Sequence, residues 1–215
     1  MPTHIREKFL FLYKFIRSPK QVGSITPSSP FLAKTMVGQV PWHRVNAVAE
    51  LGAGTGAITK FIAAARQKPT KVLLFEKDAS LREALSAAYP EFGCYADASS
   101  IDMALKKEGL GEGQLDCILS GLPFFNFPQQ LRDKLMEQIA RSLKPGGLFI
   151  AFQYSQQMKK QLDRQFELEH VRFVPLNMPP AFVYVCRKRE ETVPVTETEP
   201  YSLHPTGKER PAYEL

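Results

Sequence analysis

The chain has 215 residues, 44% of them hydrophobic, which suffices for one well-buried domain and is too little for two of ordinary size. It contains no run of 18 or more apolar residues and begins without a signal-peptide pattern, so we expect neither a membrane span nor a secretory leader. The formal net charge is +6, and without the acidic residues 190–215 the remaining 26 basic and 16 acidic residues leave +10. This surplus favours nucleic acid or an anionic membrane as partner, with a merely basic soluble enzyme as the alternative.

The first 40 residues are predicted to form an N-terminal section with two helices. One spans residues 5–17 and the other runs from Ser28 or Pro30 to Val37. Apolar residues of the first helix recur at helical spacing, with basic residues opposite (Ile5, Phe9, Leu12 and Ile16; Arg6, Lys14 and Arg17). Because the first 20 residues hold five bases and one acid, we predict an amphipathic helix on an anionic membrane surface. The alternative is a helix that docks on the sheet and covers its ligand crevice.

Residues 41–188 alternate between strand and helix patterns, which predicts an α/β domain with a mostly parallel, seven-stranded, Rossmann-like sheet covered by helices on both faces. Strands are predicted at 47–51, 71–76, 92–96, 115–119, 148–152, 167–173 and 182–187, and helices at 57–65, 80–88, 100–107, 129–143 and 156–166. Lys144 to Gly147 are predicted to stop a helix and turn into a strand. No helix separates the last two strands, so we expect an antiparallel hairpin at one edge.

Composition also sets apart the C-terminal segment and the cysteines. Residues 189–215 are rich in Pro, Glu and Thr and are predicted to be a disordered tail. The three cysteines, Cys94, Cys117 and Cys186, are too few and too widely spaced for a disulfide framework or a metal site, so we expect them to pack as small apolar residues and predict no metal.

The most informative segment is Glu50 to Gly56, where an apolar strand runs into a turn with three glycines that opens a helix. Glycine permits a sharp turn and a close approach of the backbone to a ligand, with N–H groups exposed at the helix start. A carboxylate 20 residues beyond Gly56, Glu76, ends the next predicted strand and suits the two hydroxyls of a ribose. The segment therefore predicts a nucleotide cradle.

The cradle alone leaves the cofactor open, because Gly52, Gly54 and Ala57 also satisfy the dinucleotide pattern. Three features favour S-adenosylmethionine: Glu50 can reach an ammonium, Asp97 can accept from an adenine amino group, and residues 120–124 follow the fourth strand. In open α/β sheets these segments converge at the carboxyl ends of the strands, where residues 120–124 would hold the methyl acceptor.

These residues resemble the class I S-adenosylmethionine-dependent methyltransferases over about residues 45–187. Within that family the chain looks most like the bacterial phospholipid N-methyltransferases, which convert phosphatidylethanolamine to phosphatidylcholine. The closer likeness rests on three segments, a cap at Gly23 to Ser29, the S-G-L-P-F loop at Ser120 to Phe124, and the N-x-P-P-A turn at Asn177 to Ala181.

The resemblance implies two sets of site residues. Those expected to bind the cofactor are Ser24, Thr26, Ser28, Ser29, Glu50, Gly52, Ala53, Gly54, Thr55, Gly56, Glu76, Lys77, Asp97, Ala98 and Ser120. Those expected around the reacting groups are Ser120, Gly121, Leu122, Pro123 and Phe124. No general base stands out, and the rings of Phe124, Phe125 and Phe127 are candidates to face a methylated cation.

The expected activity is N-methylation of the phosphatidylethanolamine headgroup and its partly methylated forms. The protein is expected to be a cytoplasmic monomer, peripheral on the inner face of the cell membrane and attached through residues 5–17. One alternative is an rRNA adenine dimethyltransferase. Such enzymes carry an amide side chain at the position of Gly121, so the glycine argues against this alternative. Another is a non-catalytic cofactor-binding or membrane-adaptor protein.

Overall fold

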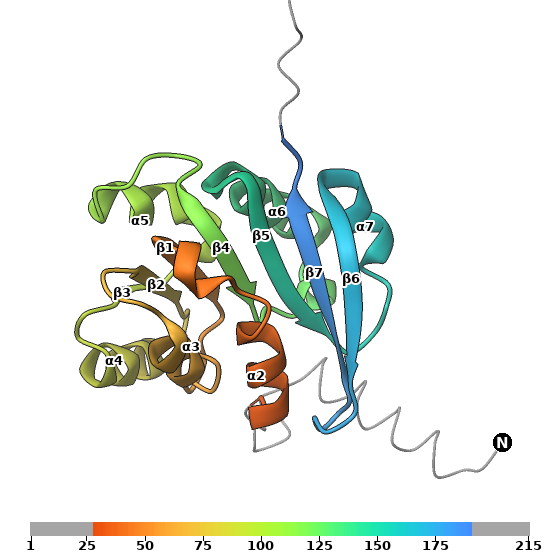
Figure 1. Ribbon diagram of the computed structural model, residues 1–215, viewed down its shortest axis with the longest axis horizontal. Helices are drawn as coiled ribbons and strands as arrows, with labels where there is room; N and C mark the ends of the chain where they lie inside the picture. Colours follow the sequence, from red (N-terminus) through yellow and green to blue (C-terminus); the bar gives the residue numbers. More distant parts are fainter. Residues whose placement is uncertain (1–27, 191–215) are drawn as a thin grey trace, which may run out of the picture.

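The computed structural model describes residues 28–190 (Figure 1). The predicted basic helix at 5–17, the cap residues Ser24 and Thr26, and the predicted tail from residue 191 onward lie outside the described residues. In the part that is described, no helix is long and apolar enough to cross a bilayer.

The elements follow the predicted order and differ from it mainly at their ends. The strands are β1 (Ala47–Leu51), β2 (Lys71–Phe75), β3 (Gly93–Tyr95), β4 (Leu115–Ser120), β5 (Leu143–Gln153), β6 (Phe166–Val174) and β7 (Ala181–Lys188). The α-helices are α2 (Pro30–Val37), α3 (Thr59–Ala65), α4 (Ala79–Ala88), α5 (Ile101–Lys107), α6 (Gln129–Ser142) and α7 (Lys159–Gln165). Three short 3₁₀ turns lie between them, η1 (Trp42–Arg44), η2 (Ala98–Ser100) and η3 (Phe124–Asn126).

The seven strands form one sheet in the order β3-β2-β1-β4-β5-β7-β6. The first five are parallel, and β7 runs antiparallel to both β5 and β6. The predicted hairpin at one edge is thus confirmed, with β6 outermost and the antiparallel strand β7 second from the edge. Strand order reverses between β1 and β4, which is where open sheets of this kind hold their ligands.

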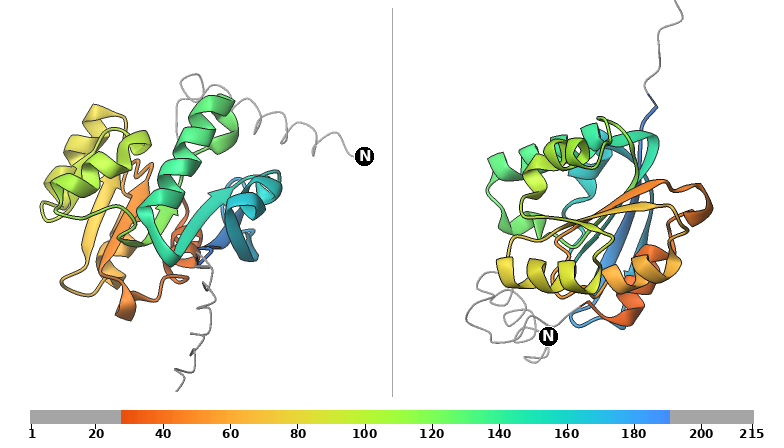
Figure 2. Two further views of the ribbon diagram at one scale, coloured as in Figure 1. Left: turned by 90° about the horizontal axis from the view of Figure 1, so that it is seen from above. Right: turned by 90° about the vertical axis from the view of Figure 1, so that its left-hand side faces the viewer.

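Helices cover both faces of the sheet, as the α/β pattern predicts (Figure 2). All five residues of β1 are buried, and successive side chains point to opposite faces. Leu51 packs on the side of α5, α6 and α7, whereas Val48 packs on the side of α2, α3 and α4. Glu50 shares a face with Val48, so its carboxylate points toward α3.

One local prediction was wrong. Lys144 to Gly147 were expected to form a turn before the strand, but α6 ends at Ser142 and β5 already begins at Leu143. Leu143 pairs with Leu115, and the next pairing joins Leu148 to Cys117, so the extra residues form an irregular bulge in β5. Gly146, at φ 71°, takes the left-handed conformation that this bulge requires.

Candidate cofactor and acceptor site

The turn from β1 to α3 has the backbone that the three glycines predict. Gly52, Gly54 and Gly56 all have positive φ, at 76°, 55° and 81°. A Cβ at Gly52 would lie 2.9 Å from the Leu122 side chain, whereas a Cβ at Gly54 would meet no atom within 4 Å. The turn is therefore packed against the loop after β4 on one side and open at Gly54.

Glu76 lies at the end of β2 and is fixed against this turn. One carboxylate oxygen accepts from the Gly54 N–H at 2.8 Å, and the other accepts from the Asp78 N–H at 2.9 Å. The Glu76 N–H itself donates to the Tyr95 carbonyl at 2.9 Å, which continues the pairing of β2 with β3. The predicted ribose-binding acid and the open glycine are thus in direct contact.

Glu50 is a buried acid, and only one of its two carboxylate oxygens has a hydrogen-bond partner among the described residues. One oxygen accepts from the Thr59 hydroxyl of α3 at 2.7 Å, while the other is buried and finds no hydrogen-bond partner among the described residues. Burial raises the pKa of Glu50 from 4.5 to about 8, against the lowering effect of the Thr59 bond, and the Glu76 charge adds to the rise. A ligand with an ammonium group would supply the missing partner.

These observations fit S-adenosylmethionine, which carries an ammonium group and ribose hydroxyls. Glu50 offers a buried carboxylate oxygen that an ammonium group could satisfy. Gly54 offers space that any side chain would narrow, and Glu76 offers a partly exposed carboxylate beside it. Thr59, which holds Glu50, was not predicted as a site residue.

Asp97 and Ala98 follow β3, as predicted. The Asp97 side chain is exposed and its two oxygens accept from the Ser99 N–H and hydroxyl and from the Ser100 hydroxyl. Partial burial raises the pKa of Asp97, but these hydrogen bonds outweigh it and leave the pKa lowered. Its proposed contact with an adenine amino group stays a prediction.

The loop after β4 meets the glycine turn. Ser120 is buried and pairs in register with Leu51, and the Gly121 N–H donates to the Leu51 carbonyl at 2.9 Å. A Cβ at Gly121 would lie only 3.3 Å from the Gly52 carbonyl oxygen and 3.4 Å from the Phe152 ring. Position 121 therefore favours glycine for lack of space.

Two further contacts hold this loop. The Leu122 N–H donates to the Ser120 hydroxyl at 3.2 Å, and the Leu122 carbonyl accepts from the buried Gln153 amide of β5 at 2.9 Å. Gln153 was not predicted, and no sequence pattern marks it. The loop is thus bound to β1 and β5 at once.

The prediction that Phe124 faces the acceptor was wrong. Phe124 is fully buried on the side of α5, α6 and α7, where its ring lies edge-on to Phe127 and Phe149. Pro123 is exposed, and the η3 turn after it directs Phe124 into the core. The side chain of Phe125 lies outside the described part of the chain.

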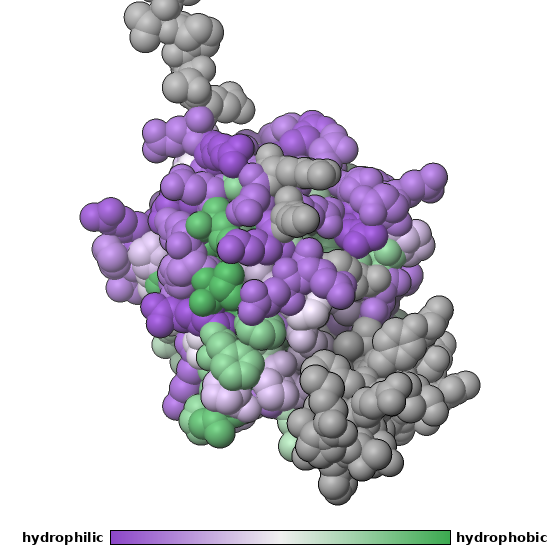
Figure 3. Space-filling view, turned by 90° about the vertical axis from the view of Figure 1, so that its right-hand side faces the viewer, coloured by the Kyte–Doolittle hydropathy of each residue, from purple (hydrophilic) through white to green (hydrophobic). Residues whose placement is uncertain are grey.

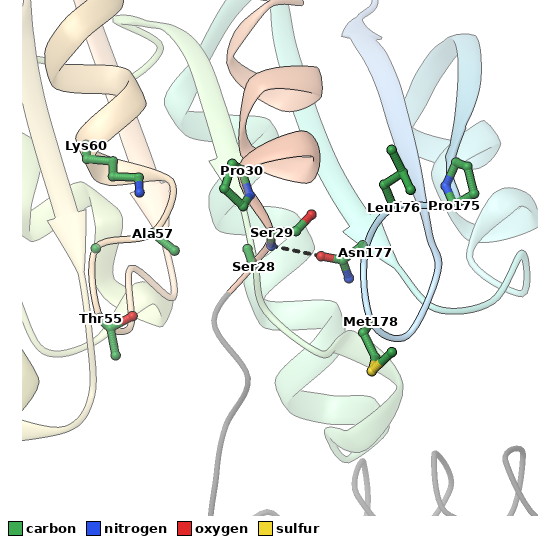
Figure 4. A pocket seen from close by; sticks show the side chains of 11 residues that line it. Ser28, Ser29, Pro30, Thr55, Ala57, Lys60, Pro175, Leu176, Asn177 and Met178 are labelled. Carbon is green, nitrogen blue, oxygen red and sulfur yellow. Dashed lines mark hydrogen bonds between the residues drawn. The ribbon is translucent and has the colours of Figure 1, made fainter.

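A cleft of about 710 Å³ opens beside the glycine turn (Figure 4). Its walls come from Ser28 to Pro30 at the start of α2, from Thr55 to Ala57 together with Lys60, and from Pro175 to Met178 in the turn between β6 and β7. The predicted cap residues Ser28 and Ser29 thus lie across the cleft from the predicted cradle residues Thr55 and Gly56. Of the other predicted contacts, Ala53 packs in the core and Lys77 is exposed.

Asn177 links the β6–β7 turn to the start of α2 at this cleft. Its buried side-chain oxygen accepts from the Ser29 N–H at 2.9 Å (Figure 4). Its amide donates to the Pro179 carbonyl at 2.7 Å. Tyr154 follows β5 and lies beside Asn177; burial raises its pKa, and a hydrogen bond with Asn177 lowers it in part. The N-x-P-P-A segment and the cap therefore meet, although they are about 150 residues apart.

Glu76→Ala is expected to weaken S-adenosylmethionine binding by about 1 to 3 kcal/mol, because it removes charge-assisted hydrogen bonds and frees the Gly54 N–H. Titration calorimetry with S-adenosylmethionine measures the effect. Glu83→Ala, which removes an exposed acid of α4, is the matched control. An unchanged affinity in the Glu76 variant would show that this carboxylate does not contact the cofactor.

Comparison with known proteins agrees with this arrangement. The family profile "Methyltransferase domain" matches residues 48–147. An ornithine lipid N-methyltransferase from Singulisphaera acidiphila is 33% identical over 194 residues, which cover 87% of this chain and 100% of that protein. A ribosomal RNA small subunit methyltransferase A from Maridesulfovibrio salexigens is 32% identical over 134 residues, covering 62% of this chain and 47% of that protein.

Solved structures share the fold at low sequence identity. One is the 1,6-didemethyltoxoflavin-N1-methyltransferase of Burkholderia thailandensis, which was determined with S-adenosylhomocysteine bound. It is 14% identical, with a TM-score of 0.61 over 88% of this chain and 92% of that chain.

Proposed function

Since the chain belongs to the class I S-adenosylmethionine-dependent methyltransferases, we propose that it N-methylates the headgroup amine of a membrane lipid, with phosphatidylethanolamine and its partly methylated forms as acceptors. The observation that carries this proposal is the similarity to the ornithine lipid N-methyltransferase, which extends over the whole of that protein. The cap, the S-G-L-P-F loop and the N-x-P-P-A turn support phosphatidylethanolamine as the particular acceptor.

The proposed reaction demands alignment more than acid or base strength. When bound, S-adenosylmethionine supplies an activated methyl group whose in-line transfer leaves a neutral thioether. Correct orientation of the two reactants accounts for roughly 7 to 11 kcal/mol of barrier lowering in such reactions. Glu50 and Glu76 would hold one partner, and the loop at Ser120 to Leu122, fixed by Gln153, would limit how the amine approaches it.

The acceptor amine must also lose a proton. If its pKa resembles that of a lysine ammonium, near 10.4, deprotonation at about pH 7.4 costs about 4 kcal/mol. Neither His43, which is exposed, nor His170, whose ring bonds to Gln39, lines the cleft. Tyr154 hydrogen-bonds with Asn177 of the cleft wall, so its hydroxyl is our proposed acceptor for a hydrogen bond from the amine.

An RNA adenine acceptor is the second candidate, favoured by the match to the ribosomal RNA methyltransferase. The space at Gly121 supports the lipid proposal instead. Base methyltransferases that use Asn-x-Pro-Tyr or Asn-x-Pro-Phe carry an amide at that position to hold the planar amine. Here a side chain at Gly121 would crowd the backbone of Gly52 and the ring of Phe152.

Paired acceptors test the lipid assignment. The protein is incubated with methyl-labelled S-adenosylmethionine and anionic vesicles that contain equal amounts of phosphatidylethanolamine and ornithine lipid, and the labelled lipids are separated chromatographically. Label is expected in mono- and dimethylated phosphatidylethanolamine. Label in ornithine lipid alone would contradict the phosphatidylethanolamine proposal and keep the amine-bearing lipid as the acceptor class.

Removal of residues 1–17 is expected to weaken binding to anionic vesicles strongly. The deleted segment carries four bases and one acid, a net charge of +3. At about 1 kcal/mol per net positive charge near an anionic surface, its loss costs about 3 kcal/mol, or roughly a hundredfold in binding. Vesicle co-sedimentation measures this, and melting by circular dichroism checks that the remaining domain is folded. Unchanged sedimentation of the shortened protein would refute the anchoring role.

A further inference from the structure

Exposed apolar side chains gather at the end of the molecule where the β6–β7 turn meets α2. Of the six large apolar side chains that are exposed in the described part of the chain, four lie on these elements, Phe31, Phe173, Leu176 and Met178. Figure 3 shows hydrophobic residues following the β6 side of the molecule toward this end. Single exposed apolar residues are common on protein surfaces, but a group of them indicates a binding surface.

The turn presents two of these residues in a fixed way. Leu176 and Met178 are 62% and 81% exposed, and they flank Asn177, whose side chain is buried. The hydrogen bonds of Asn177 to Ser29 and Pro179 tie the turn to the start of α2. Because Asn177 is fixed in this way, Leu176 and Met178 on either side of it are exposed to solvent. We call Phe173, Leu176 and Met178 the hairpin tip.

The chain segments that form the hairpin tip and the adjoining α2 carry basic residues and no acid. The sequence has no Asp or Glu between residues 28 and 49 or between residues 170 and 189. Lys34 and Arg172 lie exposed on α2 and β6, and Lys60 lies across the cleft. An apolar tip with basic neighbours is complementary to an anionic bilayer surface, where apolar groups insert and cations meet the headgroups.

We propose that the hairpin tip inserts into the interface of an anionic bilayer and thereby holds the mouth of the cleft against the lipid headgroups. Leu176 and Met178 belong both to the tip and to the wall of the cleft, so insertion would bring the cleft to the membrane. The chain preceding Ser28, with its basic residues 5–17, joins the described part at the same cleft. This inference rests on the proposed function, because only a lipid acceptor gives this docking a catalytic purpose.

The test compares Leu176→Ser/Met178→Ser with a control in the full-length protein. Met103→Ser is the control, because Met103 is 59% exposed on α5, far from the hairpin in the fold (Figure 1). Binding is measured by co-sedimentation with vesicles of phosphatidylglycerol and phosphatidylcholine, which hold no methylatable amine. The double variant is expected to partition at least tenfold less than the wild type, with the control unchanged. Equal partitioning of all three folded proteins overturns the proposal.

A second measurement separates this proposal from the proposed function. Methyl transfer to phosphatidylethanolamine is measured both in vesicles and in detergent micelles. For this measurement the substitution is Phe173→Ser, because Phe173 belongs to the hairpin tip but not to the wall of the cleft. The variant is expected to lose at least fivefold in vesicles and less than twofold in micelles. An equal loss of activity in vesicles and in micelles contradicts membrane docking. A change of oligomeric state with unaltered vesicle binding contradicts it too, because the hairpin tip would then bind a second copy of the chain. If the wild type methylates no lipid in vesicles or in micelles, the proposed function fails. The docking proposal is then still decided by the vesicle co-sedimentation measurement.

Discussion

A Glu50→Gln variant is expected to bind S-adenosylmethionine roughly ten- to a hundredfold more weakly, while its cofactor-free form unfolds at a higher temperature than the wild type. The carboxylate has one buried oxygen without a hydrogen-bond partner among the described residues, and only a cationic ligand would compensate its charge. Glutamine keeps the shape and the bond to Thr59 and removes the ionisation. Calorimetric titration and thermal melting measure the two effects.

The stability gain has a defined pH dependence. Glu50 has an ordinary pKa of 4.5, which applies to the unfolded chain, and a raised pKa of about 8 in the folded protein. Between these values the folded state binds more protons than the unfolded state, so the wild type loses stability as pH rises from about 4.5 to about 8. The glutamine variant lacks this loss, and its advantage, about 4 kcal/mol for a pKa rise of this size, is expected near pH 8 and absent near pH 4.

Glu83→Gln, an exposed change on α4, controls for the loss of one negative charge. Equal melting temperatures of the Glu50 variant and the wild type at pH 8 would show that the buried carboxylate carries no such penalty. A retained cofactor affinity would show that Glu50 does not meet the ammonium.

Gly54→Ala is expected to reduce S-adenosylmethionine affinity by at least tenfold with only a modest loss of stability. A Cβ at Gly54 meets nothing within 4 Å, so the folded chain accepts it sterically and pays only for the positive φ of 55°, about 1 to 2 kcal/mol. The added methyl group would occupy the open space beside the Glu76 carboxylate. Titration calorimetry and chemical denaturation measure the affinity and the stability.

Gly109→Ala is a closely matched control. Gly109 also has positive φ, 70°, and a Cβ there also meets nothing within 4 Å, but it follows α5, away from the cradle. Both variants are expected to lose similar stability, and only the Gly54 variant is expected to lose affinity. A similar affinity for both would mean that the space at Gly54 holds no ligand.

The fold was largely predictable because its elements carry local signals. The buried part of β2, residues 72–75, is a continuous apolar run, and the helices show a 3.6-residue period. The irregular start of β5 was missed, since Pro145 and Gly146 signal a turn in isolation. Pairing of Leu143 with Leu115 makes the same residues part of a strand, and a pairing between distant segments leaves no local pattern.

The site was predictable in its backbone and less so in its side chains. The positive-φ turn and the position of Glu76 beside it were predictable, because a close backbone approach and an acid at a strand end have a fixed spacing. That these residues bind the cofactor stays a prediction. Thr59 and Gln153 were missed because each acts through a partner distant in sequence. Phe124 was misplaced because the direction of a side chain in a short 3₁₀ turn depends on the core beneath it, which has no periodic signature in the sequence.

The central claim, that the chain methylates a lipid amine, is tested most directly by offering both acceptor classes at once. The protein is incubated with methyl-labelled S-adenosylmethionine, anionic vesicles containing phosphatidylethanolamine, and ribosomal RNA, and the label in each fraction is counted. We expect label in the lipid fraction, none in the RNA, and loss of the signal in the Glu50→Gln variant. Label in the RNA alone, or in neither fraction despite measurable cofactor binding, would contradict the claim.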